Sequence, residues 1–149
     1  MKSPPLYYLL CVALSLFGFM IVPAFAGSEM MCSQSDQKIA EEKSSTARSW
    51  NALYHLYKTY GHCDDGAIAE GFSESVSLLF IKQWTQIRDL DDLSKKDEAF
   101  ETFALKHLDE TLPNERLADI EHLAKENCPI KHARLCAKIV VRLQKIRVK

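Results

Sequence analysis

The stretch DDGAIAEGFSESVSLLFIKQWTQI, residues 64–87, decides which fold this chain can adopt. Its main apolar stripe recurs at helical spacing and follows an aspartate, Asp64 or Asp65, placed where a helix N-cap belongs. The stripe consists of Ile68, Phe72, Val76, Leu79, Gln83 and Ile87. Leu78, Ile81 and Trp84 fall outside the stripe, so the second half is apolar most of the way round. The stretch therefore predicts a helix that runs through the centre of a helical bundle.

Four further amphipathic segments have the same period. They cover residues 50–60, with an extension back to residue 36, then 95–108, 113–126 and 133–143. Gly61 ends the first, Ser94-x-x-Asp97 is a capping pattern for the second, and Pro113 suits the first turn of the third. Residues 89–92 form a link. The fold class is therefore predicted as all-α, a compact bundle of about five amphipathic helices stapled by disulfides.

The N-terminus predicts export. Lys2 precedes an almost continuous apolar run from Leu6 to Val22, and Ala24-Phe25-Ala26 is a small-x-small cleavage site. A membrane anchor is the competing interpretation, but Pro23 and the cleavage site follow the run directly and no cluster of charges follows it. We therefore expect residues 1–26 to be a signal peptide and residues 27–149 to be a single helical domain in the periplasm or secreted, without a stable membrane anchor.

Four cysteines remain after loss of Cys11 with the signal peptide, and an even number in an exported chain predicts two disulfides. A helix opened by Pro129 would hold Cys128 and Cys136 roughly 12 Å apart, too far for one bond. If residues 129–132 form a turn, Cys128 can bond Cys136, and Cys32 must then bond Cys63. The sequence leaves this choice open. We expect no metal site, because His62 beside Cys63 has no second partner at ligand spacing.

The segment after Gly61 is rich in acidic residues, and we expect Asp64, Asp65, Glu70 and Glu74 to form a binding face. Small residues, including Gly66 and Gly71, would let a neighbouring helix or a ligand approach this half of the helix closely. The competing hypothesis is a hydrolase directed at cell-wall glycan, with Glu70 as general acid and Asp65 as its partner. Capping and surface exposure explain the same residues without catalysis, so an enzyme is the minority hypothesis.

The C-terminal segment is basic. Residues 27–126 hold 11 Lys/Arg against 20 Asp/Glu, whereas residues 127–149 hold seven Lys/Arg and no acidic residue. Six cations step by three or four positions along one side of the last helix, which makes this side a second candidate binding surface. These cations are Lys131, Arg134, Lys138, Arg142, Lys145 and Lys149. Neutralisation of this stripe by the acidic helices of the same molecule is the competing explanation.

No nucleotide-binding, hydrolase-elbow or zinc-protease motif occurs in the sequence, and no cofactor is expected. The acidic remainder and the predicted export disfavour nucleic acid as a partner. In size and architecture the chain resembles the small periplasmic immunity and inhibitor proteins of Gram-negative bacteria, a resemblance that implies function by protein–protein binding. We therefore expect another exported protein as partner. A structural envelope protein without a dedicated ligand is the further alternative.

Overall fold

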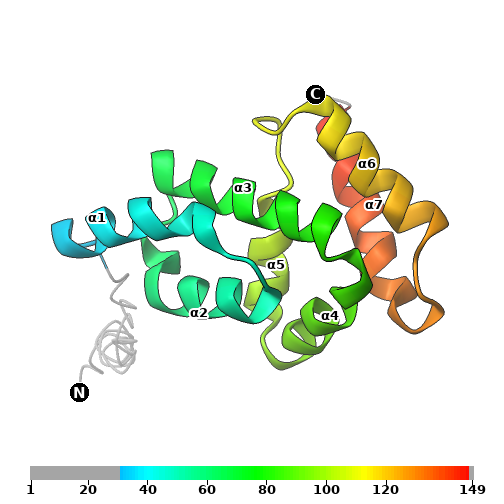
Figure 1. The fold of residues 1–149 in the computed structure, drawn as a ribbon, viewed down its shortest axis with the longest axis horizontal. Helices are drawn as coiled ribbons and strands as arrows, with labels where there is room; N and C mark the ends of the chain where they lie inside the picture. Colours follow the sequence, from blue (N-terminus) through cyan, green and yellow to red (C-terminus); the bar gives the residue numbers. More distant parts are fainter. Residues whose placement is uncertain (1–30, 148–149) are drawn as a thin grey trace, which may run out of the picture.

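The computed structural model describes residues 31–147, which form seven α-helices and contain no strand (Figure 1). The all-α fold class is thus confirmed, whereas the expected number of five helices is wrong. The helices are α1 (Gln34–Lys43), α2 (Trp50–Tyr60), α3 (Gly66–Lys82), α4 (Ile87–Lys96), α5 (Glu98–Lys106), α6 (Asn114–Glu126) and α7 (Ala133–Arg147). The whole of the expected signal peptide, residues 1–26, and Lys149 lie outside the described residues.

The first extra helix comes from the N-terminal side of the predicted 50–60 segment. Residues expected to extend that helix form α1 instead, which Ser33 caps by accepting from the Asp36 N–H. A short 3₁₀ turn, η2 (Ser44–Thr46), follows. The chain is extended at Ala47 and Ser49, and Ser49 caps α2 by accepting from the Ala52 N–H. Ser33 begins one helix and Ser49 begins the next, so the stretch that the periodicity predicted as one helix forms two.

The second extra helix comes from a break in the predicted 64–87 helix. α3 ends at Lys82, and the 3₁₀ turn η4 (Trp84–Gln86) leads directly into α4. The Trp84 indole N–H donates to the Asn127 carbonyl over 2.9 Å, which anchors this turn to the end of α6. Residues 89–92, predicted as a link, therefore lie inside α4, and the next helix begins after Asp97, whose carboxylate accepts from the Phe100 N–H.

α3 is the central element, as predicted. It crosses the middle of the molecule, with α1 and α2 towards one end and α6 and α7 at the other (Figure 1). Its predicted stripe residues Ile68, Phe72, Val76 and Leu79 are all buried. Aromatic side chains fill the adjoining core, where the ring centroids of Phe72 and Phe103 lie 5.0 Å apart in an edge-to-face arrangement.

Glycine lets α3 approach η2 closely. A Cβ atom built on Gly71 would lie 2.0 Å from Ser44 Oγ and 2.9 Å from Ser44 Cβ, so no larger residue fits at this crossing. Next to it, the buried Ser75 hydroxyl donates to the Ser44 carbonyl over 2.6 Å and accepts from the Ala47 N–H over 3.2 Å. The small residues of this half of α3 therefore receive a neighbouring segment of the same chain.

Two disulfides join Cys32 to Cys63 and Cys128 to Cys136. Pro129 precedes the 3₁₀ turn η5 (Ile130–His132) rather than opening the α-helix, so the Cα atoms of Cys128 and Cys136 lie 6.2 Å apart. This is the second of the two pairings left open by the sequence. In residues 31–147 no helix combines the length and the apolar character needed to cross a membrane.

Candidate functional site

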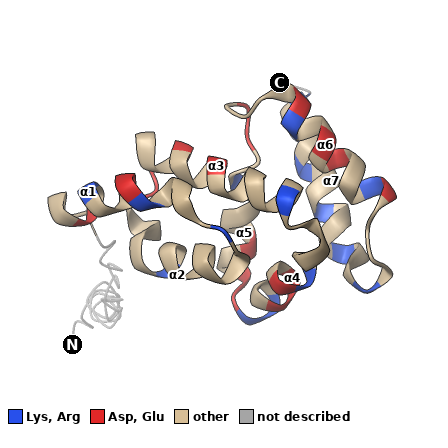
Figure 2. Ribbon diagram, viewed as in Figure 1, with Lys and Arg blue, Asp and Glu red and all other residues tan. Residues whose placement is uncertain are grey.

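The predicted basic stripe on α7 is partly neutralised within the molecule. Arg134 Nη2 lies 2.7 Å from Glu101 Oε2, and Lys138 donates to the other carboxylate oxygen of Glu101. Glu101 itself is 4% exposed, so α5 supplies a buried anion to two cations of α7. Figure 2 shows Lys and Arg residues at intervals along α7 and acidic residues on the neighbouring α4.

Arg142 binds the C-terminal end of α5. Its guanidinium donates to the carbonyls of Leu105, Lys106 and Leu108 over 2.8–3.1 Å. The last carbonyls of a helix lack intrahelical partners and carry the negative end of the helix dipole, so a cation is stabilised here. Lys131 and Lys145, in contrast, are exposed and contact no acidic partner within residues 31–147.

A second buried carboxylate, Asp91 of α4, binds the start of the C-terminal segment. It is 2% exposed and lies 2.8 Å from His132 Nδ1, 2.6 Å from Lys95 Nζ and 3.4 Å from Arg134 Nη2. Burial raises the pKa of Asp91, but hydrogen bonds from Lys95 and His132 outweigh it and leave the pKa below its ordinary value. The pKa of Glu101 is lowered in the same way, against burial, by Arg134 and Lys138.

Neither Asp91 nor Glu101 was among the predicted site residues. A signal for Asp91 exists in the sequence, because it shares a helical face with Ile87, Leu90 and Ser94, all of which are buried. A charged residue on an apolar face needs a buried partner. Lys95 on the same helix supplies one partner, and His132 and Arg134, some forty residues away along the chain, supply the others.

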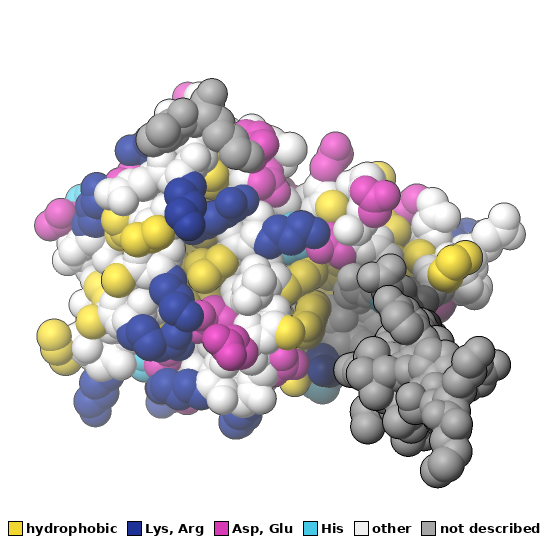
Figure 3. Space-filling model, turned by 180° about the vertical axis from the view of Figure 1, so that it is seen from behind, with side chains coloured by type: hydrophobic (Ala, Val, Ile, Leu, Met, Phe, Trp, Pro, Cys, Tyr) yellow, Lys and Arg dark blue, Asp and Glu magenta, His cyan; other side chains and the backbone are white. Residues whose placement is uncertain are grey.

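Next to these ion pairs, α5 and α7 border an open groove of about 380 Å³, which we call the α5–α7 groove. Its lining combines three apolar residues with three cations, namely Leu105, Ala137 and Val141 with Lys138, Arg142 and Lys145. Val141 is 49% exposed. On the face seen in Figure 3, Lys and Arg side chains surround hydrophobic side chains in the half of the molecule that contains α7.

The predicted acidic face of α3 is mostly occupied by partners within the molecule. Asp64 lies 2.8 Å from Lys106 Nζ, and Glu74 forms an ion pair with Arg116. Asp65 is the N-cap of α3 and accepts from the Gly66 N–H over 2.8 Å. Only Glu70 of the four is exposed without a partner in the described part of the chain. Since Asp65 serves as a cap, its position gives no support to a catalytic pair with Glu70.

Asp64, His107 and Ser73 form a hydrogen-bonded chain that has the residue types of a hydrolytic triad. His107 Nε2 lies 3.2 Å from Asp64 Oδ2, and Nδ1 lies 3.0 Å from Ser73 Oγ. The Ser73 hydroxyl, however, donates its only hydrogen to Asp109 over 2.8 Å. Ser73 and His107 are 2% and 1% exposed. A substrate could not reach this hydroxyl, so the cluster is better explained as a buried polar network that joins α3 to the end of α5.

The electrostatics of this network follow from its contacts. Burial raises the pKa of Asp64, but hydrogen bonds from His107 and Lys106 outweigh it and lower the pKa below its ordinary value. The pKa of Asp109 is likewise lowered, against burial, by hydrogen bonds from Thr111 and Ser73. Both carboxylates therefore remain ionised as acceptors at neutral pH.

One group of metal-type ligands also comes together in the described residues, namely Cys32, His62 and Cys63, whose ligand atoms lie within 4.8 Å of one another. No second partner for His62 was visible at ligand spacing, because Cys32 is remote along the chain and only the fold brings it close.

Comparisons with known proteins give no relative. No family model matches the chain, and no curated protein or solved structure is significantly similar to it. The function is therefore inferred from the residues and surfaces described above.

Proposed function

We propose that this protein is exported and acts by binding another exported protein, which it receives in the α5–α7 groove. One observation carries the proposal: exposed apolar side chains and cations line the same open groove. Apolar contact supplies most of the affinity of a protein interface, and charges around it set orientation and association rate.

The cations of the groove are held in place before any partner arrives. Lys138 is bound by Glu101, and Arg142 by three carbonyls of the α5 end. Binding therefore costs less side-chain entropy than it would with freely moving cations. Lys145 is exposed and adds a charge that no described acidic residue neutralises. The acidic face of α3 is the weaker candidate, because none of the large apolar side chains that are strongly exposed in residues 31–147 lies on α3.

The chemistry of the groove indicates the partner. A segment with apolar side chains for Leu105, Ala137 and Val141 and with carboxylates beside them would satisfy both parts of the lining. We therefore propose an acidic amphipathic segment of an exported protein. The two disulfides support the exported location, since such bonds persist in oxidising compartments.

The proposal is tested by affinity capture from a periplasmic or secreted extract, followed by direct titration of the identified partner. Val141→Asp places an anion on the apolar floor and should weaken binding by at least roughly tenfold. Lys145→Glu should weaken it most at low salt, because exposed charges are screened at high salt.

Lys131→Glu is the matched control, since it makes the same charge change on an exposed lysine outside the groove. It should leave affinity nearly unchanged. If Glu70→Lys abolishes binding while Val141→Asp does not, the partner binds the α3 face and the proposed surface is wrong. If no exported protein is retained by the unmodified chain, binding as the function is refuted.

A further inference from the structure

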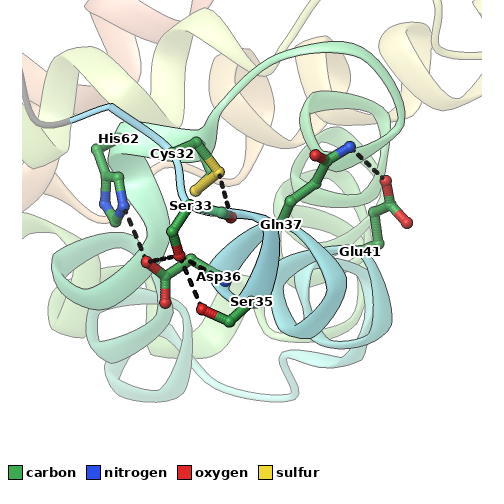
Figure 4. The surroundings of a disulfide bond; sticks show 8 residues. Cys32, Ser33, Ser35, Asp36, Gln37, Glu41 and His62 are labelled. Atoms are coloured by element: carbon green, nitrogen blue, oxygen red, sulfur yellow. Dashed lines mark hydrogen bonds and ion pairs between the residues drawn. A yellow bond between two sulfur atoms is a disulfide. The ribbon is translucent and has the colours of Figure 1, made fainter.

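We propose that Cys32, His62 and Cys63 form a zinc site when the disulfide between the two cysteines is reduced. This inference goes beyond the proposed function and is independent of it. Cys32 precedes α1, whereas His62 and Cys63 belong to the 3₁₀ turn η3 (Gly61–Cys63). In Figure 4 His62 lies beside the disulfide of Cys32, with its ring turned towards Asp36. The ligand atoms of Cys32, His62 and Cys63 lie within 4.8 Å of one another.

The donor set suits Zn²⁺. Two thiolates and an imidazole are common zinc ligands, with Zn–S distances of about 2.3 Å and Zn–N distances of about 2.0 Å. In a tetrahedral site the two sulfur atoms would lie roughly 4 Å apart, so reduction must let them separate. Cys32 can make this movement, because it is exposed and lies outside any helix. Cys63, which is 3% exposed, is the fixed ligand.

Asp36 completes the arrangement. Its Oδ2 atom lies 3.7 Å from His62 Nε2, and the side chain is partly exposed (Figure 4). A carboxylate at this distance can either take the fourth coordination position or accept the second N–H of a metal-bound imidazole. Both roles favour zinc binding by His62.

Zinc and a reductant can reach the site. A cavity of about 260 Å³ is lined by both cysteines and by the acidic residues Glu41 and Asp65, so a reductant can reach the disulfide through it; His62 is not part of its lining. The N-terminus of α3 begins at Gly66, close to Cys63, and the positive end of a helix dipole favours a thiolate over a thiol.

The reaction is balanced as follows. A dithiol reductant transfers two electrons and two protons to the Cys32–Cys63 bond, which gives two thiols and leaves the reductant as a cyclic disulfide. Zn²⁺ then binds the two sulfur atoms and displaces both thiol protons. A disulfide oxidant reverses the change: it takes up two electrons, the S–S bond forms again and Zn²⁺ is released.

The test uses residues 27–149 with Cys128→Ala and Cys136→Ala, so that Cys32 and Cys63 are the cysteines that remain. This protein is reduced with a phosphine, freed of reductant and titrated with Zn²⁺ against a chromophoric chelator. We expect one zinc per reduced chain and none per oxidised chain. Co²⁺ in place of Zn²⁺ should show thiolate-to-metal charge-transfer absorption.

The matched control adds Cys32→Ser and Cys63→Ser, which also removes the cross-link but keeps His62 and Asp36. It should bind no zinc, and His62→Ala with both cysteines present should weaken binding by at least roughly tenfold. Circular dichroism of the reduced protein records whether it stays helical. Equal zinc uptake by the reduced protein and the serine control overturns the proposal, and so does a reduced chain that loses its helices and takes up no zinc.

Discussion

Replacing Gly71 by alanine should destabilise the protein, although alanine is the better helix former. In the interior of a helix the change gains about 1 kcal/mol of propensity. The new Cβ, however, would lie 2.0 Å from Ser44 Oγ, 2.9 Å from Ser44 Cβ and 3.3 Å from the Ser45 amide nitrogen. Rotation of the Ser44 hydroxyl relieves only the first contact, and Ser44 is 1% exposed, so η2 itself must move.

Movement of η2 would also strain the two hydrogen bonds of Ser75, to the Ser44 carbonyl and from the Ala47 N–H. Overpacking of this kind costs about 1–3 kcal/mol. After subtraction of the propensity gain, we expect Gly71→Ala to lower the free energy of unfolding by about 0–2 kcal/mol, with about 1 kcal/mol as the central value. Urea unfolding followed by circular dichroism, with linear extrapolation to water, measures this difference.

The control places glycine at position 44, on the other side of the contact between α3 and η2. Ser44→Gly removes both side-chain atoms that the new Cβ would meet, so Ser44→Gly combined with Gly71→Ala should be more stable than the sum of the two single changes predicts. A Gly71→Ala protein that is more stable than the unmodified chain by the full propensity gain of about 1 kcal/mol, or additive effects in the double variant, would refute the close approach of α3 and η2.

Three further predictions concern the cross-links and the buried charges. Loss of the Cys32–Cys63 bond, which spans 31 residues, should cost more stability than loss of the Cys128–Cys136 bond, which spans 8. The entropy of the closed loops gives costs of about 3.7 and about 2.5 kcal/mol. Thermal unfolding of two variants, each with one pair of cysteines replaced by alanine, measures which loss is larger. Glu101→Gln should lower the free energy of unfolding by roughly 1–2 kcal/mol, since it keeps the shape of the side chain but removes the charge that Arg134 and Lys138 bind. In the same urea assay Glu98→Gln, on the exposed surface of α5, should change the free energy of unfolding little. Acid should destabilise the fold, because the pKa values of Asp64, Asp91 and Glu101 are lowered in the folded state. The stability that these carboxylates contribute is present above their ordinary pKa values of 3.8 and 4.5 and is lost as pH falls through the folded-state values. A midpoint of urea unfolding that stays constant down to about pH 3 would contradict these contacts.

The spacing of the cations on α7 could not predict which of them are neutralised within the molecule. The spacing of its cations was visible in the sequence, and so was the alternative that acidic helices of the same molecule neutralise them. Which cations are neutralised depends on Glu101 of α5 and the carbonyl end of that helix, which the fold places beside Arg134, Lys138 and Arg142. No spacing rule could have separated these three from Lys131 and Lys145.

The helix count failed for a related reason. Periodicity predicts which residues share a face, and every residue of the stripe 68–79 is buried as expected. It does not predict where a helix gives way to a 3₁₀ turn while the apolar face continues, as happens at Trp84, whose indole is held by a carbonyl at the end of α6. The expectation of one helix over 64–87 therefore fails at a tertiary contact.

By itself the sequence determined the helical class, the central position of α3, an aspartate N-cap at position 64 or 65 and the four cysteines that pair. These features depend on residues within one or two turns of each other, where hydrogen bonding and side-chain spacing are local. Only the tertiary structure decided the partners of the cysteines, the burial of Asp91 and Glu101, the groove beside Val141 and the meeting of Cys32 with His62. Each of these joins residues far apart in the chain, and their proximity is set by packing of whole helices rather than by sequence spacing.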